Sequence, residues 1–172
     1  MTSVSTDYVI AVDDPARNDI RALVQTHREW SLQQTPPEFS FSVEPHAVAE
    51  SGITLFSARS PDGALLGIGG LKELDPHHGE IKTMHTAAEA RGHRVGRGVL
   101  EALLAEATRR GYTQVSLETG TGDAFRPARK LYESFGFRPS EPFGGYANTD
   151  YNVCMTLLLS GSNTVATRIL SP

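Results

Sequence analysis

Apolar residues recur along the chain with two different periods, and each period predicts a different kind of element. A short β-prone run covers residues 8–12. From Ile20 to Trp30 the apolar positions follow helical spacing, and the sequence Thr35-Pro36-Pro37 ends that stripe. The pair Asp13-Asp14, with proline directly after it, predicts the start of this helix, because both residue types favour a helix N-terminus.

A β-hairpin is predicted after this helix. Residues 38–52 carry scattered apolar positions and a proline, a pattern typical of a connection, with a short helix near residues 46–50. Two β-like runs, residues 53–60 and 64–74, then flank the turn sequence Ser60-Pro61-Asp62-Gly63. Because proline and an Asp-Gly pair favour tight turns, the two runs form a predicted antiparallel hairpin.

A third strand and a long helix follow the hairpin. A turn over residues 75–79 leads into the strand, residues 80–86, whose side chains should alternate between the two faces of the sheet. This alternation would place on one face Ile81, Thr83 and His85. Helical spacing then covers residues 95–110 and ends at Arg109-Arg110-Gly111, because cations and a following glycine are typical of a helix C-terminus.

The remaining pattern alternates strand and helix. Residues 114–117 predict a strand, residues 127–135 a helix, and residues 152–159 a last strand. Together the elements predict an α/β fold in one domain, residues 1–159, with a mixed central sheet flanked by helices. Residues 160–172 are rich in Ser, Asn and Thr and predict a loose C-terminal tail.

Composition and charge narrow the class of protein. The 172 residues, 39% apolar and 21% charged, are typical of one soluble globular domain. A formal net charge of −4 argues against a nucleic-acid or membrane partner, because no overall positive field exists to hold either. A single cysteine, Cys154, cannot form an internal disulfide. With no signal-like start and no apolar run near roughly 18 residues, the sequence predicts a cytoplasmic protein.

The most informative stretch for function is Arg91-Gly92-His93-Arg94-Val95-Gly96-Arg97-Gly98, which precedes and opens the long helix. The first turn of a helix has unpaired N–H groups and a partial positive charge, and glycines let a ligand approach its backbone. Three arginines add fixed charge, and no acidic residue occurs between Glu89 and Glu101. The stretch therefore predicts a phosphate-binding site. The alternative is a solvated, glycine-rich helix start with scattered arginines.

Two common glycine-rich phosphate motifs do not match this stretch. A Walker A loop needs Gly-Lys followed by Ser or Thr, and the chain contains no Gly-Lys pair. A dinucleotide fingerprint needs a third glycine after Gly96-x-Gly98, but Glu101 stands at that position. Nucleotide hydrolysis and dinucleotide chemistry are therefore disfavoured.

The order of motifs resembles that of the GNAT superfamily of acyl-CoA-dependent N-acetyltransferases. The resemblance rests on Glu80-Ile81-Lys82, on Arg91-Gly92-x-x-Val95-Gly96 before the long helix, and on Ala128-x-x-Leu131-Tyr132-x-x-x-Gly136-Phe137. Leu117-Glu118-Thr119-Gly120, Pro142-Phe143 and Tyr146 resemble a bacterial, uncharacterised subgroup of that superfamily. The resemblance implies a GNAT-like fold with a mostly antiparallel sheet.

The resemblance also implies a site for acetyl-CoA or another short acyl-CoA. The strand before the loop would pair with the pantetheine arm, and the loop would hold the pyrophosphate. Two positions depart from the usual pattern, because Arg94 stands where glycine is typical and Phe125 where an asparagine often touches the cofactor. The implied cofactor-binding residues are Met84, His85, Thr86, Arg91, Gly92, His93, Arg94, Val95, Gly96, Arg97, Gly98 and Phe125.

The chemistry implied by the resemblance is direct attack of a primary amine on the thioester. Such a reaction needs a base to collect the amine proton and a donor to protonate the departing thiolate. Tyr132 resembles the superfamily's donor, although a core aromatic on a helix would look the same. Glu80 lies where histone-acetylating members carry their base, although a strand glutamate is more often simply exposed. The alternative function is a non-catalytic acyl-CoA-binding sensor or partner module.

The amine acceptor, a small molecule or a peptide, is not identified by the sequence. In the superfamily it is selected by segments that correspond here to residues 26–50 and 141–151. Candidate acceptor contacts are His27, Trp30 and Tyr146, with a half-buried core histidine as the alternative for the first. The histidines lack metal-ligand spacing, so we expect no metal site. Homodimer formation is left open.

Overall fold

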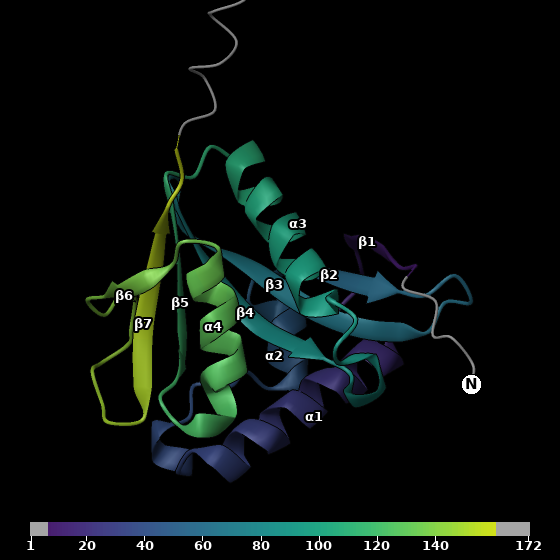
Figure 1. Ribbon diagram of the computed structural model, residues 1–172, viewed down its shortest axis with the longest axis horizontal. Helices are drawn as coiled ribbons and strands as arrows, with labels where there is room; N and C mark the ends of the chain where they lie inside the picture. The colour runs from purple at the N-terminus through teal and green to yellow at the C-terminus, as the bar shows by residue number, and fades with distance from the viewer. Residues whose placement is uncertain (1–6, 161–172) are drawn as a thin grey trace, which may run out of the picture.

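The computed structural model describes residues 7–160, which form a seven-stranded sheet with helices on both faces (Figure 1). The strands are β1 (Val9–Val12), β2 (Thr54–Arg59), β3 (Leu65–Asp75), β4 (His78–Thr86), β5 (Gln114–Gly120), β6 (Arg138–Ser140) and β7 (Asn152–Leu158). The helices are α1 (Asn18–Gln34), α2 (Pro45–Glu50), α3 (Val95–Arg109) and α4 (Arg126–Ser134), with 3-10 turns η1 (Pro37–Phe39), η2 (Ala88–Ala90) and η3 (Asp123–Phe125).

The sheet has the strand order β1-β2-β3-β4-β5-β7-β6, and only the β4–β5 pair is parallel. The predicted mixed, mostly antiparallel sheet is therefore confirmed. Apolar stripes hold the helices to it. Val99 and Leu103 of α3 belong to a core cluster on one face, whereas Ile20 and Val24 of α1 pack with Ile68 on the other. Within the described residues, no helix is long and apolar enough to cross a membrane.

The sheet splits at its parallel pair, and this split positions the site. β4 and β5 are paired only as far as Ile81 and Leu117. Beyond that point β4 continues beside β3 and β5 continues beside β7, so the two strands diverge (Figure 1). The β5-facing edge of β4 from Lys82 to Thr86 is consequently left without a neighbouring strand.

A β-bulge at Thr83 changes which side chains of β4 face the split. Thr83 and Met84 together lie opposite a single β3 residue, Gly69, and Thr83 has a φ of 59°. An extra residue in one strand reverses the alternation beyond it. His85 therefore lies on the α1 face with Glu80 and Lys82, not with Ile81 as the simple alternation predicts.

Several predicted boundaries are corrected by the structure. Helix α1 begins at Asn18 and not at Asp13-Asp14. Asp13 instead accepts hydrogen bonds from Ser57 (2.6 Å) and from Arg59 Nε (2.8 Å), which tie the chain before α1 to β2. Strand β6 was not predicted, because three residues that include a proline carry no periodic signal. The predicted tail lies outside the described residues from residue 161 onward.

Candidate active site

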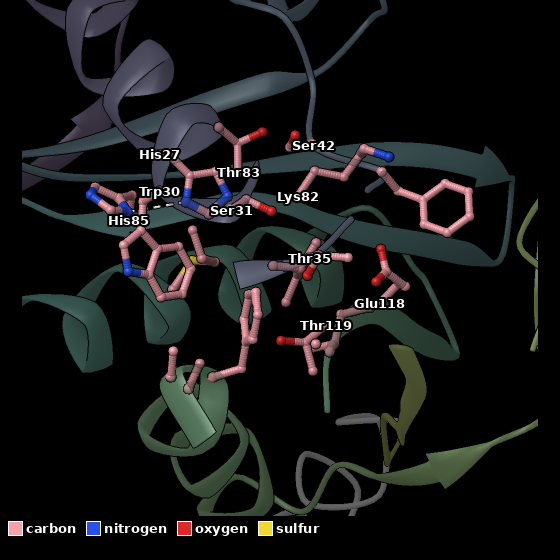
Figure 2. A pocket seen from close by; sticks show the side chains of 18 of the residues that line it. His27, Trp30, Ser31, Thr35, Ser42, Lys82, Thr83, His85, Glu118 and Thr119 are labelled. Atoms are coloured by element: carbon pink, nitrogen blue, oxygen red, sulfur yellow. Dashed lines mark hydrogen bonds between the residues drawn. The ribbon is translucent and has the colours of Figure 1, made fainter. Parts of the chain in front are cut away.

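A cavity of about 620 Å³ opens where β4 and β5 separate. Its walls come from α1 and the segment after it, from β4 and β5, and from α3, η3 and α4. Figure 2 shows its two sides: His27, Trp30 and His85 gather at one side, and Lys82 and Glu118 at the other. One end of the cavity lies at the first turn of α3, where the sequence predicts phosphate binding, and is called the phosphate-binding end after that prediction. A middle section runs beside β4, and a far end lies beyond Lys82.

The first turn of α3 supplies the phosphate-binding end. The first helical hydrogen bond runs from the Gly98 N–H to the Arg94 carbonyl (3.0 Å), so the N–H groups of residues 95–97 have no acceptor within the helix. Gly96 lines the cavity, and a Cβ added there would lie 3.4 Å from Thr86 Oγ1. A ligand can therefore approach this backbone closely. Unpaired N–H groups, the helix dipole and the side chain of Arg91 together fit a diphosphate.

The predicted loop residues play different structural parts. Arg91 lines the cavity, whereas Arg97 forms an ion pair with Glu101 (3.3 Å) and lies 4.8 Å from the centre of the Phe135 ring. Arg94 has a φ of 62°, in the left-handed region, which explains why a glycine would be favoured at this position. The others take further roles: Gly92 has a φ of 81°, His93 is half-buried, Val95 is buried in the core, and Gly98 packs against Tyr8.

Replacing Arg91 should weaken CoA binding, because this arginine reaches the cavity. We expect Arg91→Ala to raise the Kd for CoA about 10- to 100-fold, corresponding to about 1.5–3 kcal/mol for a charge-assisted hydrogen bond. Isothermal titration calorimetry measures the change. Arg109→Ala is the matched control, since that side chain is exposed at the other end of α3 and pairs with Glu106. An unchanged Kd in Arg91→Ala would remove the arginine from the phosphate site.

The middle section runs along the unpaired edge of β4. The Thr83 hydroxyl is buried and has no hydrogen-bond partner among the described residues, and its side chain lines the cavity. The free backbone edge from Lys82 to Thr86 and this orphaned hydroxyl fit a ligand with amide groups, such as a pantetheine arm. Met84, His85 and Thr86 all line this section as well.

Aromatic side chains cover the middle section from the α1 side. His27 Nδ1 lies 3.0 Å from His85 Nδ1 (Figure 2), and Trp30 contacts Phe125 of η3 with ring centres 4.8 Å apart. Burial lowers the pKa of both histidines to about 4, with His85 also acting on His27 and Arg91 on His85. Both imidazoles are therefore neutral at pH 7. Phe125, the departure from the superfamily pattern, forms an apolar wall.

Glu80 is placed behind the cavity and not on its wall. Its side chain is 4% exposed, and its Oε1 accepts hydrogen bonds from Lys82 Nζ (3.2 Å) and from the Tyr146 hydroxyl. Lys82 also donates to the Tyr146 hydroxyl (2.7 Å). Lys82 and Tyr146 line the cavity, whereas Glu80 lines a smaller hollow on their far side. Glu80 thus reaches the cavity through these two residues.

Glu118 is a cavity carboxylate that the sequence analysis did not assign. It is half-buried on β5, and no described residue donates a hydrogen bond to it. Burial raises its pKa to about 7, with Lys82 opposing the rise and Glu80 adding to it. One signal in the sequence could have identified Glu118: this charged residue directly follows the apolar strand predicted to end at Leu117.

Tyr132 of α4 lies on the same cavity. It is 6% exposed, and its ring packs against Phe137 with centres 5.9 Å apart. Burial, and then the carboxylate of Glu118, raise the pKa of its hydroxyl above the ordinary value. The hydroxyl has no hydrogen-bond partner among the described residues. The structure therefore brings a protonated phenol and a carboxylate with a near-neutral pKa to one cavity.

The described residues, 7–160, were considered for a metal site. No group of three or more His, Cys, Asp or Glu side chains in this range could hold an ion. His78 of the predicted turn pair is the first residue of β4, and its Nε2 lies 2.7 Å from the Ser116 hydroxyl.

Fold and site together define an acetyltransferase class. A sheet that splits at its parallel pair, with an anion-binding helix start beside the split, is the GNAT architecture predicted from the motifs. The sequence profile of the Acetyltransferase (GNAT) family matches residues 20–137, and the chain belongs to this family.

Individual proteins support this assignment. The chain is 42% identical over 147 residues to the Bacillus subtilis (strain 168) protein named uncharacterized N-acetyltransferase YsnE, covering 86% of this chain and 97% of that one. A Klebsiella pneumoniae structure, provisionally described as an acyl-CoA N-acyltransferase, superimposes with a TM-score of 0.73 and 26% identity, covering 91% of this chain and all of that one (100%). A GNAT family acetyltransferase from Elizabethkingia anophelis, solved with acetyl-CoA bound, shares the fold (TM-score 0.64, 17% identity, 88% and 98% covered).

Proposed function

We propose that this acetyltransferase moves an acetyl group from acetyl-CoA to a primary amine by direct attack within a ternary complex. The observation that carries the proposal is the order of groups along one cavity. Unpaired N–H groups and Arg91 stand at one end, the free edge of β4 lies beside the middle, and Tyr132 and Glu118 face the space beyond. This order matches the diphosphate, the pantetheine arm and the thioester of acetyl-CoA. The Elizabethkingia acetyltransferase, which shares the fold and was solved with acetyl-CoA bound, supports the choice of cofactor.

The residues of the chain have distinct proposed roles. Acetyl-CoA supplies the activated acetyl group when bound. The amine nitrogen forms the new bond to the acetyl carbon while the carbon–sulfur bond breaks, and Glu118 accepts the amine proton directly or through water. Tyr132 donates its proton to the departing thiolate and recovers one from solvent. Backbone N–H groups of β4 stabilise the charge on the carbonyl oxygen. Glu80 holds Tyr146 and Lys82 in place and acts on Glu118 through its charge.

Calorimetry and a thiol-release assay test this proposal together. We expect isothermal titration calorimetry to show that acetyl-CoA binds. We expect the free thiol of CoA to appear only when protein, acetyl-CoA and a suitable primary amine are all present. Binding without thiol release on every amine tested would identify a non-catalytic acyl-CoA-binding module instead. Failure to bind acetyl-CoA would contradict both functions.

A further inference from the structure

The far end of the cavity is walled by aromatic rings that the proposed chemistry does not use. Four such residues line it: Phe39, Phe41, Tyr146 and Tyr151, together called the acceptor end. The Tyr146 hydroxyl accepts a hydrogen bond from Lys82, and Lys82 precedes Thr86 on β4 by four positions. Thr86 lies at the end of the middle section that adjoins Gly96 of the phosphate-binding end. Because the bulge adds one residue between Lys82 and Thr86, the two lie opposite β3 residues three steps apart, roughly 10 Å at the usual strand rise. The acceptor end is therefore a different part of the cavity from the cofactor site.

The rings form two pairs that join separate segments of the chain. Phe39 stacks on Tyr151 with ring centres 4.9 Å apart and planes at 24°, and Phe41 meets Tyr146 edge-on at 5.0 Å. Each pair links the segment after α1 to the loop before β7. Phe41 and Tyr151 are 38% and 41% exposed, so they lie at the mouth where an acceptor would enter from solvent.

The loop that carries the tyrosines is held in place before any acceptor arrives. The buried Asn152 side chain accepts hydrogen bonds from the Thr149 N–H and hydroxyl (both 2.9 Å) and donates to the Ala147 carbonyl (3.1 Å). The Tyr151 carbonyl accepts a hydrogen bond from the Thr121 N–H (3.1 Å). A preformed apolar wall binds a rigid apolar group without the entropic cost of ordering the loop.

Charge is scarce at the acceptor end. In the described part of the chain, the Lys, Arg, Asp and Glu side chains that line the cavity are Lys82, Arg91 and Glu118. Arg91 belongs to the phosphate-binding end, and Lys82 is already paired with Glu80. A carboxylate or phosphate on the acceptor would therefore have to share the Lys82 ammonium with Glu80 and Tyr146. Among the described residues that line the cavity, Glu118 is the single carboxylate. The reacting amine needs it, so a second ammonium group would have no counter-ion there.

We propose that the acceptor is a primary amine carried on an uncharged body the size of one aromatic ring, such as a 2-arylethylamine. Its ring would lie against the Phe39–Tyr151 and Phe41–Tyr146 pairs, with its amine toward Glu118. This inference rests on the proposed acetyl transfer and specifies its substrate class.

Matched amines and one wall variant test the inference. At saturating acetyl-CoA, thiol release is measured with 2-phenylethylamine, with phenylalanine, which adds a carboxylate to the same skeleton, with putrescine, which carries a second ammonium, and with an alanyl tripeptide amide. We expect kcat/KM for 2-phenylethylamine to exceed each of the others at least tenfold. Phe39→Ala should lower that value at least tenfold through KM, because it removes one ring of the wall. Val9→Ala, an apolar truncation at an exposed position of β1, should leave it unchanged.

The other results each have a definite meaning. A preference for phenylalanine, putrescine or the peptide would overturn the acceptor class while leaving acetyl transfer in place. An equal loss on all four amines, carried by kcat in Phe39→Ala, would show that the ring only supports the fold. If the protein binds acetyl-CoA and acetylates none of the amines, the proposed function fails and this inference fails with it.

Discussion

Replacing Tyr132 by phenylalanine should reduce turnover about 100-fold or more while leaving acetyl-CoA affinity within twofold of the wild-type value. The substitution keeps the ring against Phe137 and removes only the hydroxyl, which has no hydrogen-bond partner among the described residues. Loss of a positioned general acid costs roughly 10²- to 10⁴-fold in rate. Because the pKa of this hydroxyl is raised, the wild-type enzyme should keep its donor protonated well above pH 8. Steady-state kinetics, calorimetry and thermal unfolding measure the three quantities.

Tyr112→Phe provides the matched control for this experiment. Tyr112 is also buried, but it lies outside the cavity and donates its hydroxyl to Glu73 (2.9 Å). Its loss should lower stability by about 0.5–1.5 kcal/mol, the usual net value of a hydrogen bond, without changing kcat. The opposite pattern is expected for Tyr132→Phe, which should keep the wild-type stability and have a strongly reduced kcat. A Tyr132→Phe enzyme with wild-type turnover would leave the tyrosine as a core aromatic, the alternative that the sequence left open.

The fold was predictable because its elements have strong local signals. The Ser60-to-Gly63 turn, the apolar stripe of α3 and its Gly111 stop each predict one element from neighbouring residues, and the structure contains all three. The stretch predicted to bind phosphate also has a local signal, and its placement at the first turn of α3 agrees with the sequence, while phosphate binding itself stays a prediction. Asp13 shows the limit of this reasoning, because its hydrogen bonds go to Ser57 and Arg59, more than 40 positions away (44 and 46). No local pattern distinguishes that contact from a helix cap.

The site was less predictable because it depends on strand register. The bulge at Thr83 reverses the alternation on β4, and nothing in a Lys-Thr-Met sequence marks a residue with positive φ. The parallel pairing of Glu80 with Ser116 then decides which β5 side chains share its face. Glu118 lies two residues beyond Ser116 and so joins that face. A motif comparison could point to the β4 glutamate, but only the assembled sheet shows which carboxylate lines the cavity.

The dependence of rate on pH distinguishes Glu118 from Glu80 as the general base. If Glu118 is the base, activity needs its ionised form, so kcat should rise with pH through about 7, the pKa to which burial raises this group. Glu118→Gln should abolish that acid limb and lower kcat roughly 10²-fold or more, because a neutral amide cannot accept the amine proton in this pH range. The profile should be recorded with two amines of different pKa, since a limb that belongs to the substrate would move with the amine.

Glu80→Gln is the matched variant, because it makes the same change behind the cavity wall. The negative charge of Glu80 raises the pKa of Glu118, and Lys82 lowers it. Glu80→Gln removes the negative charge that raises the pKa of Glu118. It also removes the ion-pair partner of Lys82, so the Lys82 ammonium acts more strongly on Glu118. Both effects shift the pKa of Glu118 downward. The acid limb should survive in Glu80→Gln and move to lower pH, with most of kcat retained. Loss of the limb in Glu80→Gln and its survival in Glu118→Gln would reverse the assignment and make Glu80 the base, acting through Tyr146 and Lys82.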